Sequence, residues 1–430
     1  MRRALCRRRK STWTSLQTEK FYDLEVISYL SPGCSHLRAV VVEFSLLRAA
    51  LTLAGAKLSR SAYYGPLSII SFREDYPEPE LRGPEWVKVR SVLSGICGSD
   101  MRLVTLSESM YLYPLTSFPL VLGHEVVGVV EEVGEKVRGV EEGERVVLDD
   151  VLSCRVRGVE ELCPSCREGR YSICHNFDGG NLSPGMFTGF CRDTGGAWSD
   201  YFVAHEFQLF RVPGGVSDEA AVFTEPFAVS LHAALKSFPR DDEAVAVVGC
   251  GVMGIGVIAA LRALGFKGEI IGVDIYKFQG EMAKRFGATR TVIAEEGGRV
   301  IEDLAEITGG RVYYPPREKP MFVGGGVDVV FECVGQAGTV DDSLRIVKPG
   351  GTVVLVGTAG KLSGVDWAPI FSKEIVVKGV LGSGEEKVNG GRRAFDLALD
   401  LFSKGRVNLS PLLTHKFPIE KWREALKVSL

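Results

Sequence analysis

The sequence predicts an α/β protein in which a β-rich, barrel-like module precedes a doubly wound parallel sheet. Short alternating strands with glycine turns occupy residues 60–212. From about residue 241, apolar strands alternate with helical segments, which indicates right-handed βαβ units. The chain has 430 residues, a length that allows two or three domains. Hydrophobic residues make up 45% and charged residues 24%, as is ordinary for a soluble globular protein.

The β-rich module is predicted from three segments. Residues 85–92 and 126–133 alternate apolar and polar side chains, as half-buried strands do, and residues 145–148 continue the series. Gly134 and Gly139 supply turn residues after the second segment.

The parallel sheet is predicted from four apolar strands, at residues 243–249, 269–274, 326–332 and 351–357. A helix ending near Leu264 follows the first strand, and a helix over 279–286 follows the second. Residues 308–326 are rich in Gly and Pro and are expected to form an exposed loop.

Charge and composition exclude several classes of protein. Lys and Arg number 51 and Asp and Glu 54, so a net charge of −3 gives no reason to expect a nucleic-acid or membrane partner. The most apolar stretch, residues 40–56, is interrupted by Glu43 and Arg48 and is too short to span a bilayer. Ten cysteines are too few for a disulfide scaffold, and with no secretory signal we expect a cytoplasmic protein.

The N-terminal residues differ from the rest of the chain in charge. Six of the first ten are Arg or Lys, and no acidic residue precedes Glu19. A targeting presequence would have this composition, but no clear amphipathic helix or cleavage pattern follows. We therefore expect residues 1–45 to be an extension, disordered or begun from a start codon placed too early.

A glycine motif follows the first strand of the parallel sheet. Gly249-Cys-Gly-Val-Met-Gly254 fits the dinucleotide-binding pattern between a strand and a helix. Gly249 permits the tight turn, Gly251 permits close backbone approach to the pyrophosphate, and Gly254 permits close helix–strand packing. The amides of Val252 and Met253 open the helix, where the dipole favours phosphate.

The next strand ends in an acidic residue that selects the cofactor. Asp274 lies twenty residues after Gly254, where a carboxylate binds the adenosine ribose hydroxyls and repels a 2′-phosphate. NAD is therefore expected in preference to NADP. Tyr276 and Lys277 lie close enough to keep NADP possible.

One candidate zinc site draws on distant parts of the chain. Cys97, in Gly-Ile-Cys-Gly-Ser-Asp, offers a thiolate, and His124, in Gly-His-Glu, offers an imidazole. Asp100 is placed to orient the imidazole, and Glu225 is a candidate oxygen ligand.

A second candidate zinc site is local. Cys163, Cys166 and Cys174 are spaced as C-x2-C-x7-C, and Cys154 lies upstream. Four thiolates close a tetrahedral structural site. The fourth ligand is open at this point, since His175 is an alternative to Cys154.

Taken together, these residues resemble the zinc-dependent medium-chain dehydrogenases, a family that includes alcohol, polyol, glucose and threonine dehydrogenases. The resemblance covers about residues 50–430. The motifs that carry it, in family order, are Gly-Ile-Cys97-Gly-Ser-Asp, Gly-His124-Glu, the cysteine lobe, Glu225-Pro and Gly249-x-Gly-x-x-Gly254.

The resemblance implies a GroES-like catalytic domain that is split around a Rossmann domain. Its expected segments are 46–227 for the catalytic domain with the zinc lobe, 228–365 for the NAD-binding domain, and 366–430 for the return to the catalytic domain. It also implies a zinc ion held by Cys97 and His124 with Glu125 or Glu225 as third ligand, and a homodimer or homotetramer.

Three features depart from the family pattern. Eight residues separate Cys154 from Cys163, where two are usual. Arg102 occupies the position of a relay histidine, five residues after Cys97. The chain also stops at Leu430 within an expected helix, which suggests a truncated product.

The expected activity is hydride transfer from a small-molecule secondary alcohol, polyol, sugar or hydroxy amino acid to NAD. An open zinc position would acidify the substrate hydroxyl, and Ser99 is the candidate first proton acceptor. The zinc-free quinone reductase branch lacks this Cys and His set. A catalytically inactive NAD-binding regulatory protein of the same fold is the other alternative.

Overall fold

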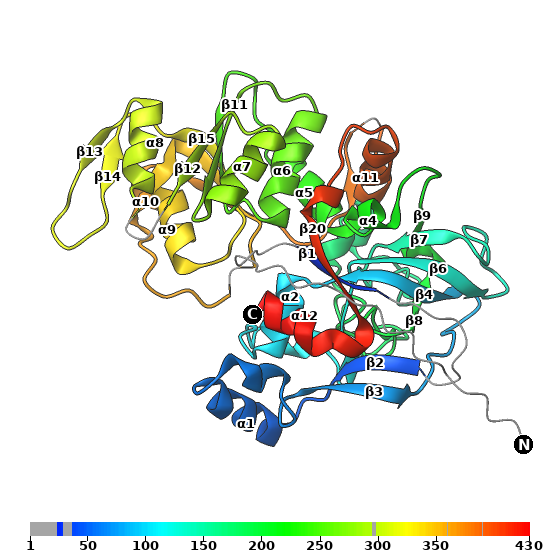
Figure 1. Ribbon diagram of the computed structural model, residues 1–430. Coiled ribbons are helices and arrows are strands. Elements are labelled where there is room, and N and C mark those ends of the chain that lie inside the picture. The colour runs from blue at the N-terminus through cyan, green and yellow to red at the C-terminus, as the bar shows by residue number, and fades with distance from the viewer. Residues whose placement is uncertain (1–23, 29–36, 295–297, 359, 389) are drawn as a thin grey trace, which may run out of the picture.

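The computed structural model describes residues 24–28, 37–294, 298–358, 360–388 and 390–430. It consists of two units built on separate sheets, with the parallel-sheet unit at upper left and the β-rich unit at lower right in Figure 1. This arrangement confirms the predicted α/β class. Among the described residues, no helix has both the length and the apolar character that crossing a membrane requires.

The β-rich unit contains a seven-stranded and a three-stranded sheet. The larger has the order β20-β1-β4-β6-β7-β9, with β8 on β4, and the smaller has the order β3-β2-β5. The strands are β1 (Leu24–Ser28), β2 (Leu37–Val42), β3 (Ile70–Tyr76), β4 (Trp86–Gly95), β5 (Leu120–Val121), β6 (Val126–Val133), β7 (Arg145–Leu148), β8 (Tyr201–His205), β9 (Leu209–Arg211) and β20 (Leu413–Pro418). The three segments predicted from alternation form β4, β6 and β7.

Short helices connect and cover these strands. They are α1 (Leu46–Ala56), α2 (Gly98–Val104), α3 (Pro164–Arg167), α4 (Asp218–Ala221) and α12 (Trp422–Ser429), with 3-10 turns at Arg60–Tyr64, Tyr113–Leu115, Tyr171–Ile173, Glu206–Gln208, Ser410–Leu412 and Ile419–Lys421. The predicted C-terminal helix is α12.

The second unit is a six-stranded, fully parallel sheet with helices on both faces. Its order is β12-β11-β10-β15-β16-β17. The strands are β10 (Ala244–Val248), β11 (Glu269–Asp274), β12 (Arg290–Ile293), β15 (Val327–Glu332), β16 (Val347–Leu355) and β17 (Val376–Gly379), and the helices are α6 (Val252–Ala263), α7 (Lys277–Arg285), α8 (Val300–Thr308), α9 (Ala337–Ile346) and α10 (Ala368–Ser372). The chain reverses direction across the sheet after β12, so the doubly wound prediction is confirmed.

Three segments differ from the expectation. Strand β2 lies within 1–45, and residues 39–42 are fully buried between β3 and β5 because the run Ala-Val-Val-Val is apolar and β-branched. Strand β1 also lies within 1–45 and pairs with β20 and β4, so this part of the expected extension belongs to the larger sheet. Residues 1–23 and 29–36 lie outside those described. Strand β17 still pairs with β16, so the parallel sheet extends past residue 366. The expected loop 308–326 contains a hairpin, β13 (Arg311–Tyr313) with β14 (Met321–Val323).

Helix α5 (Thr224–Lys236) joins the two units. It packs against α6 on one side and α11 (Ala394–Ser403) on another, and the rings of Phe227 and Phe402 stack with centroids 5.2 Å apart. The short strands β18 (Glu385–Glu386) and β19 (Arg392–Arg393) lead into α11. One apolar cluster includes side chains of β4, β6 and β7 together with those of α5, α6 and β10, so a single core spans both units.

The α5–α6 contact depends on a glycine. A Cβ at Gly256 would lie 2.4 Å from Ser230 Oγ and 2.9 Å from Ser230 Cβ, well inside van der Waals contact. The Ser230 hydroxyl also lies 3.2 Å from the carbonyl of Met253 and 2.9 Å from that of Pro226.

We expect Gly256→Ala to lower the free energy of unfolding by about 1–3 kcal/mol because the added methyl group forces the two helices apart. Thermal unfolding followed by circular dichroism measures the effect. Gly338→Ala is the matched control, since Gly338 is in helix α9 and its Cβ would meet nothing within 4 Å. Equal stability of the two variants would contradict the close packing described here.

Candidate active site and metal centres

The first cluster begins where strand β4 passes into helix α2. Cys97 is the N-cap of α2, and its backbone N–H donates to Asp100 Oδ2 at 2.9 Å. Asp100 is fully buried, and its other oxygen, Oδ1, lies 3.4 Å from His124 Nδ1. The start of α2 thus fixes both the thiol and the carboxylate that faces the imidazole.

His124 and Glu125 approach from the segment between β5 and β6. The chain turns there at Gly123, whose φ is +93°, and a Cβ at that position would lie 2.4 Å from Trp198 Cδ1. Cys97, His124 and Glu125 each present a ligand atom within 4.8 Å of the other two. Ser99 Oγ lies 3.4 Å from His124 Nε2, on the ring edge opposite Asp100.

Acidic side chains crowd this cluster. Glu225, in the first turn of α5, and Asp150, just after β7, both interact electrostatically with His124 and Glu125. Burial raises the pKa of Glu125 and of Asp150 to about 7, while His124 offsets part of that effect. Burial and repulsion from Asp150 and Glu125 raise the pKa of Glu225 well above its usual value.

The cluster fits a divalent cation. Burial and the Glu125 carboxylate raise the pKa of the Cys97 thiol to about 11, because one imidazole offers little compensation for so many acidic groups. Asp100 Oδ1, His124 Nδ1 and Glu125 Oε2 are buried and have no hydrogen-bond partner of good geometry among the described residues. A thiolate, an imidazole and a carboxylate are the ligands of catalytic zinc sites.

The sequence predicted four residues of this site, and the structure places them together: Cys97, Ser99, His124 and Glu125. Glu225 faces the same centre but lies outside the compact group of three ligand atoms. Asp150 was missed. The sequence feature that could have indicated Asp150 is the acidic pair Asp149-Asp150, which directly follows the apolar strand β7 and is buried.

The second cluster contains four cysteines in one loop. Cys154, Cys163, Cys166 and Cys174 are all buried, and their sulfur atoms lie within 4.8 Å of one another. The Sγ atoms of Cys154 and Cys174 are 3.5 Å apart, and those of Cys163 and Cys174 are 4.0 Å apart. A tetrahedral zinc ion with Zn–S bonds of about 2.3 Å requires sulfur atoms about 3.8 Å apart, so the donor set fits zinc.

Polar hydrogens point at these sulfur atoms, as they do around thiolates. Cys163 Sγ accepts from the backbone N–H groups of Cys166 and His175, both at 3.4 Å. Cys154 Sγ accepts from the side chain of Asn176 at 3.2 Å. The His175 ring is exposed and lies 3.1 Å from Ser165 Oγ, away from the sulfur atoms. Cys154, not His175, is therefore the fourth member of the cluster.

The glycine motif forms the turn between β10 and α6. Gly249 has φ +87°, and Gly251 is the N-cap of α6. A Cβ at Gly251 would meet nothing within 4 Å, so open space lies in front of the helix N-terminus and the amides of Val252 and Met253. A Cβ at Gly254 would lie 1.9 Å from the carbonyl oxygen of Gly249, so only glycine fits there.

Asp274 ends β11 beside this turn. Its Oδ2 accepts from the backbone N–H of Cys250 at 2.7 Å, and its Oδ1 accepts from that of Tyr276 at 2.8 Å. Burial raises the pKa of Asp274. The carboxylate is thereby fixed at the carboxyl edge of the parallel sheet, where dinucleotides bind in such folds.

Comparison with known proteins agrees with this geometry. Residues 83–214 match the alcohol dehydrogenase GroES-like domain, and residues 252–404 match the zinc-binding dehydrogenase domain. L-threonine 3-dehydrogenase of Alteromonas mediterranea is 30% identical over 356 residues, which cover 82% of this chain and 90% of that protein.

Solved structures give the same result. A zinc-binding dehydrogenase of Sinorhizobium meliloti bound to NADP superposes with a TM-score of 0.68 at 27% identity, covering 92% of this chain and 96% of that one. The 2R,3R-butanediol dehydrogenase of Bacillus subtilis superposes with a TM-score of 0.65 at 26% identity, covering 90% and 94%. The chain therefore belongs to the zinc-dependent medium-chain dehydrogenase family.

Proposed function

We propose that this oxidoreductase oxidises a secondary alcohol, polyol, sugar or hydroxy amino acid with NAD, using a catalytic zinc ion held by Cys97, His124 and Glu125. The observation that carries the proposal is the convergence of a thiol, an imidazole and a carboxylate from α2 and the β5–β6 segment at one point. The cysteine lobe would hold a second, structural zinc ion. The relatives named as threonine and butanediol dehydrogenases support the substrate class.

The residues of the chain have separable roles in this proposal. A bound zinc ion supplies Lewis acidity that lowers the pKa of a substrate hydroxyl. Asp100 orients the imidazole of His124 through the contact with Nδ1. Ser99, on the other edge of the ring, accepts the substrate proton and passes its own to solvent, since a hydroxyl donates and accepts at once.

Glu225 and Asp150 supply further negative charge at the same centre, and Glu225 is placed on the helix that also packs against α6. We infer that Glu225 would serve as a fourth ligand, adding a second carboxylate oxygen directly or through water. The turn at Gly249–Gly254 would hold the pyrophosphate of NAD and Asp274 its adenosine ribose, and the bound cofactor would supply the hydride acceptor. The fixed carboxylate of Asp274 favours NAD over NADP.

We expect Cys97→Ala to reduce kcat/KM by at least about 1,000-fold because the metal supplies several kcal/mol of transition-state stabilisation. Zinc analysis should show about one ion per chain instead of two, with NADH binding retained. Cys191→Ala is the control, since Cys191 is a buried free thiol that lies outside both clusters. Normal turnover in Cys97→Ala would overturn the catalytic assignment, and absence of turnover in the wild type would favour an inactive NAD-binding protein.

We expect Cys166→Ala to lose the structural zinc ion and to unfold several degrees lower, because three thiols no longer complete a tetrahedral site. Zinc content and thermal unfolding measure the two effects. A variant that retained two zinc ions and the wild-type melting temperature would show that the lobe does not hold metal.

We expect Asp274→Asn to shift the ratio of kcat/KM for NAD to that for NADP toward NADP by about tenfold, since it removes the charge that repels a 2′-phosphate. The amide oxygen can still accept from one of the two backbone N–H groups that Asp274 binds, so thermal unfolding of the variant is measured beside its kinetics. Asp242→Asn, at an exposed acid before β10, is the control. An unchanged ratio would mean that Asp274 does not face the ribose.

A further inference from the structure

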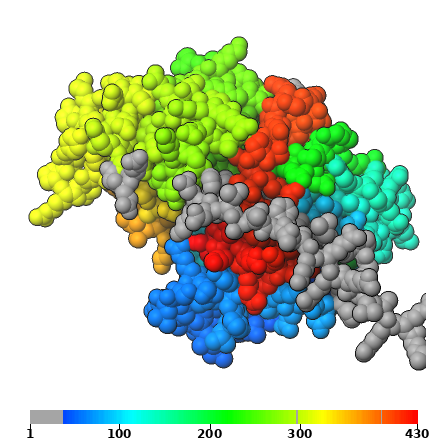
Figure 2. Space-filling view, in the orientation of Figure 1, coloured from blue at the N-terminus to red at the C-terminus, as the bar shows by residue number. Residues whose placement is uncertain are grey.

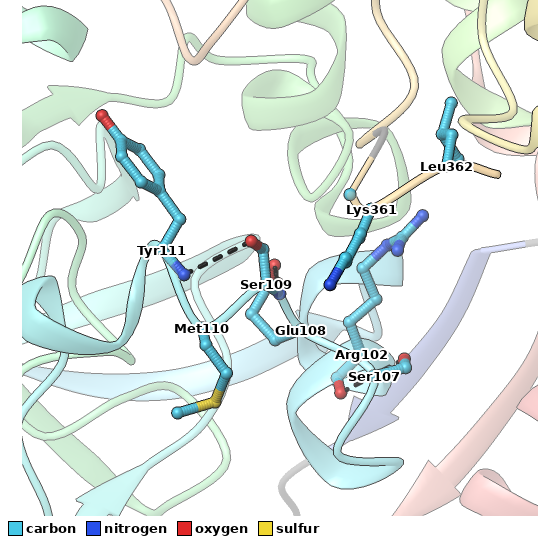
Figure 3. A pocket seen from close by; sticks show the side chains of 9 residues that line it. Arg102, Ser107, Glu108, Ser109, Met110, Tyr111, Lys361 and Leu362 are labelled. Atoms are coloured by element: carbon cyan, nitrogen blue, oxygen red, sulfur yellow. Dashed lines mark hydrogen bonds between the residues drawn. The ribbon is translucent and has the colours of Figure 1, made fainter.

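A cavity of about 460 Å³ lies between the two units (Figure 3). One wall is formed by Arg102 of α2 and the loop 107–111 that follows it. The other wall is formed by Gly360, Lys361 and Leu362, in the loop that follows β16. The cavity is thus bounded by the helix that begins at Cys97 and by the carboxyl edge of the nucleotide-binding sheet.

Two cationic side chains from the two walls meet in this cavity. Arg102 Nε donates to Thr358 Oγ1 at 2.9 Å, which fixes the guanidinium group across the gap between the units. Figure 3 shows the Lys361 side chain reaching from the upper loop to lie beside Arg102. Within the described part of the chain, neither cation forms an ion pair with a carboxylate.

The remaining lining is polar. Ser107 and Ser109 contribute hydroxyl groups, and Glu108 contributes a carboxylate whose Oε1 accepts from the backbone N–H of Ser109 at 2.8 Å. Two cations and one carboxylate leave the cavity with a net positive charge. Such a cavity favours an anionic ligand, and a guanidinium group matches the two oxygens of a carboxylate or phosphate.

The position of the cavity relates this ligand to the reaction. Arg102 follows Cys97 by five residues, which is about 7.5 Å along a helix axis. Thr358 and Lys361 follow β16 at the sheet edge where the crevice for the nucleotide opens. A group bound here would therefore lie beside the helix that starts at Cys97 and at the carboxyl edge of the nucleotide-binding sheet.

We propose that Arg102 and Lys361 bind an oxyanion substituent of the alcohol substrate, either a carboxylate or a phosphate monoester. This inference rests on the proposed dehydrogenase function and narrows its substrate class to anionic alcohols. The residue that takes the place of a relay histidine is, in this reading, a substrate-binding residue.

The test compares matched substrates with and without the anion. KM and kcat are measured with NAD for 3-hydroxybutyrate against 2-pentanol, and for sorbitol 6-phosphate against sorbitol, in wild type, Arg102→Gln and Lys361→Gln. We expect each variant to raise KM for the anionic member of the preferred pair by about 10- to 100-fold and for the neutral member by less than about threefold. Lys136→Gln, at an exposed lysine after β6, is the control.

The outcomes are distinct. A selective loss for the carboxylate pair or for the phosphate pair supports the proposal and identifies the oxyanion. An equal rise in KM for neutral and anionic substrates, together with a raised KM for NAD, would show that Arg102 and Lys361 bind the cofactor pyrophosphate. That result would overturn the proposal. Turnover of neutral alcohols only, unaffected by either variant, would also overturn it. No turnover of any substrate by wild type would refute the proposed function itself.

Discussion

Helix α5 is the element on which the arrangement of the two units depends. Its first turn carries Glu225 toward the acid-rich cluster, and farther along the helix its Ser230 contacts α6, which follows the glycine turn. Because Gly256 allows the two helices to approach closely, the metal cluster and the dinucleotide turn are held by one continuous apolar core. The distance between the metal cluster and the glycine turn is then set by helix packing, which is close to incompressible.

The charge distribution of the cluster explains why a cation belongs there. Asp100, Glu125 and Asp150 are all buried close to one imidazole, and burying carboxylates without compensation is costly. Burial lowers the pKa of His124, but Asp100 and Cys97 together raise it well above its usual value. Without a metal, these buried carboxylates repel one another and lower the stability of the fold. A bound divalent ion would relieve that repulsion, so the repulsion favours metal binding.

Local patterns in the sequence predicted most of the fold, and long-range contacts account for most of what was missed. The turn at Gly249, Gly251 and Gly254 was predicted correctly because it forms within one strand–turn–helix unit. The cysteine lobe was similarly local, although only the folded loop distinguishes Cys154 from His175. Asp150 and Lys361 could not be assigned, since their significance depends on which loops meet across the barrel end and the interdomain cavity. Strand β17 was placed in the wrong unit because a four-residue strand is too short for its sequence to indicate which strand it pairs with.

The pairing of β20 with β1 has a consequence for synthesis on the ribosome. These strands lie side by side in the larger sheet, yet they are separated in the chain by every strand of the parallel sheet. Since translation proceeds from the N-terminus, the parallel sheet has all of its strands before β20 emerges, and β1 is an edge strand of the larger sheet until then. The inserted unit is thus able to fold first, and the interrupted sheet receives its last strand afterwards.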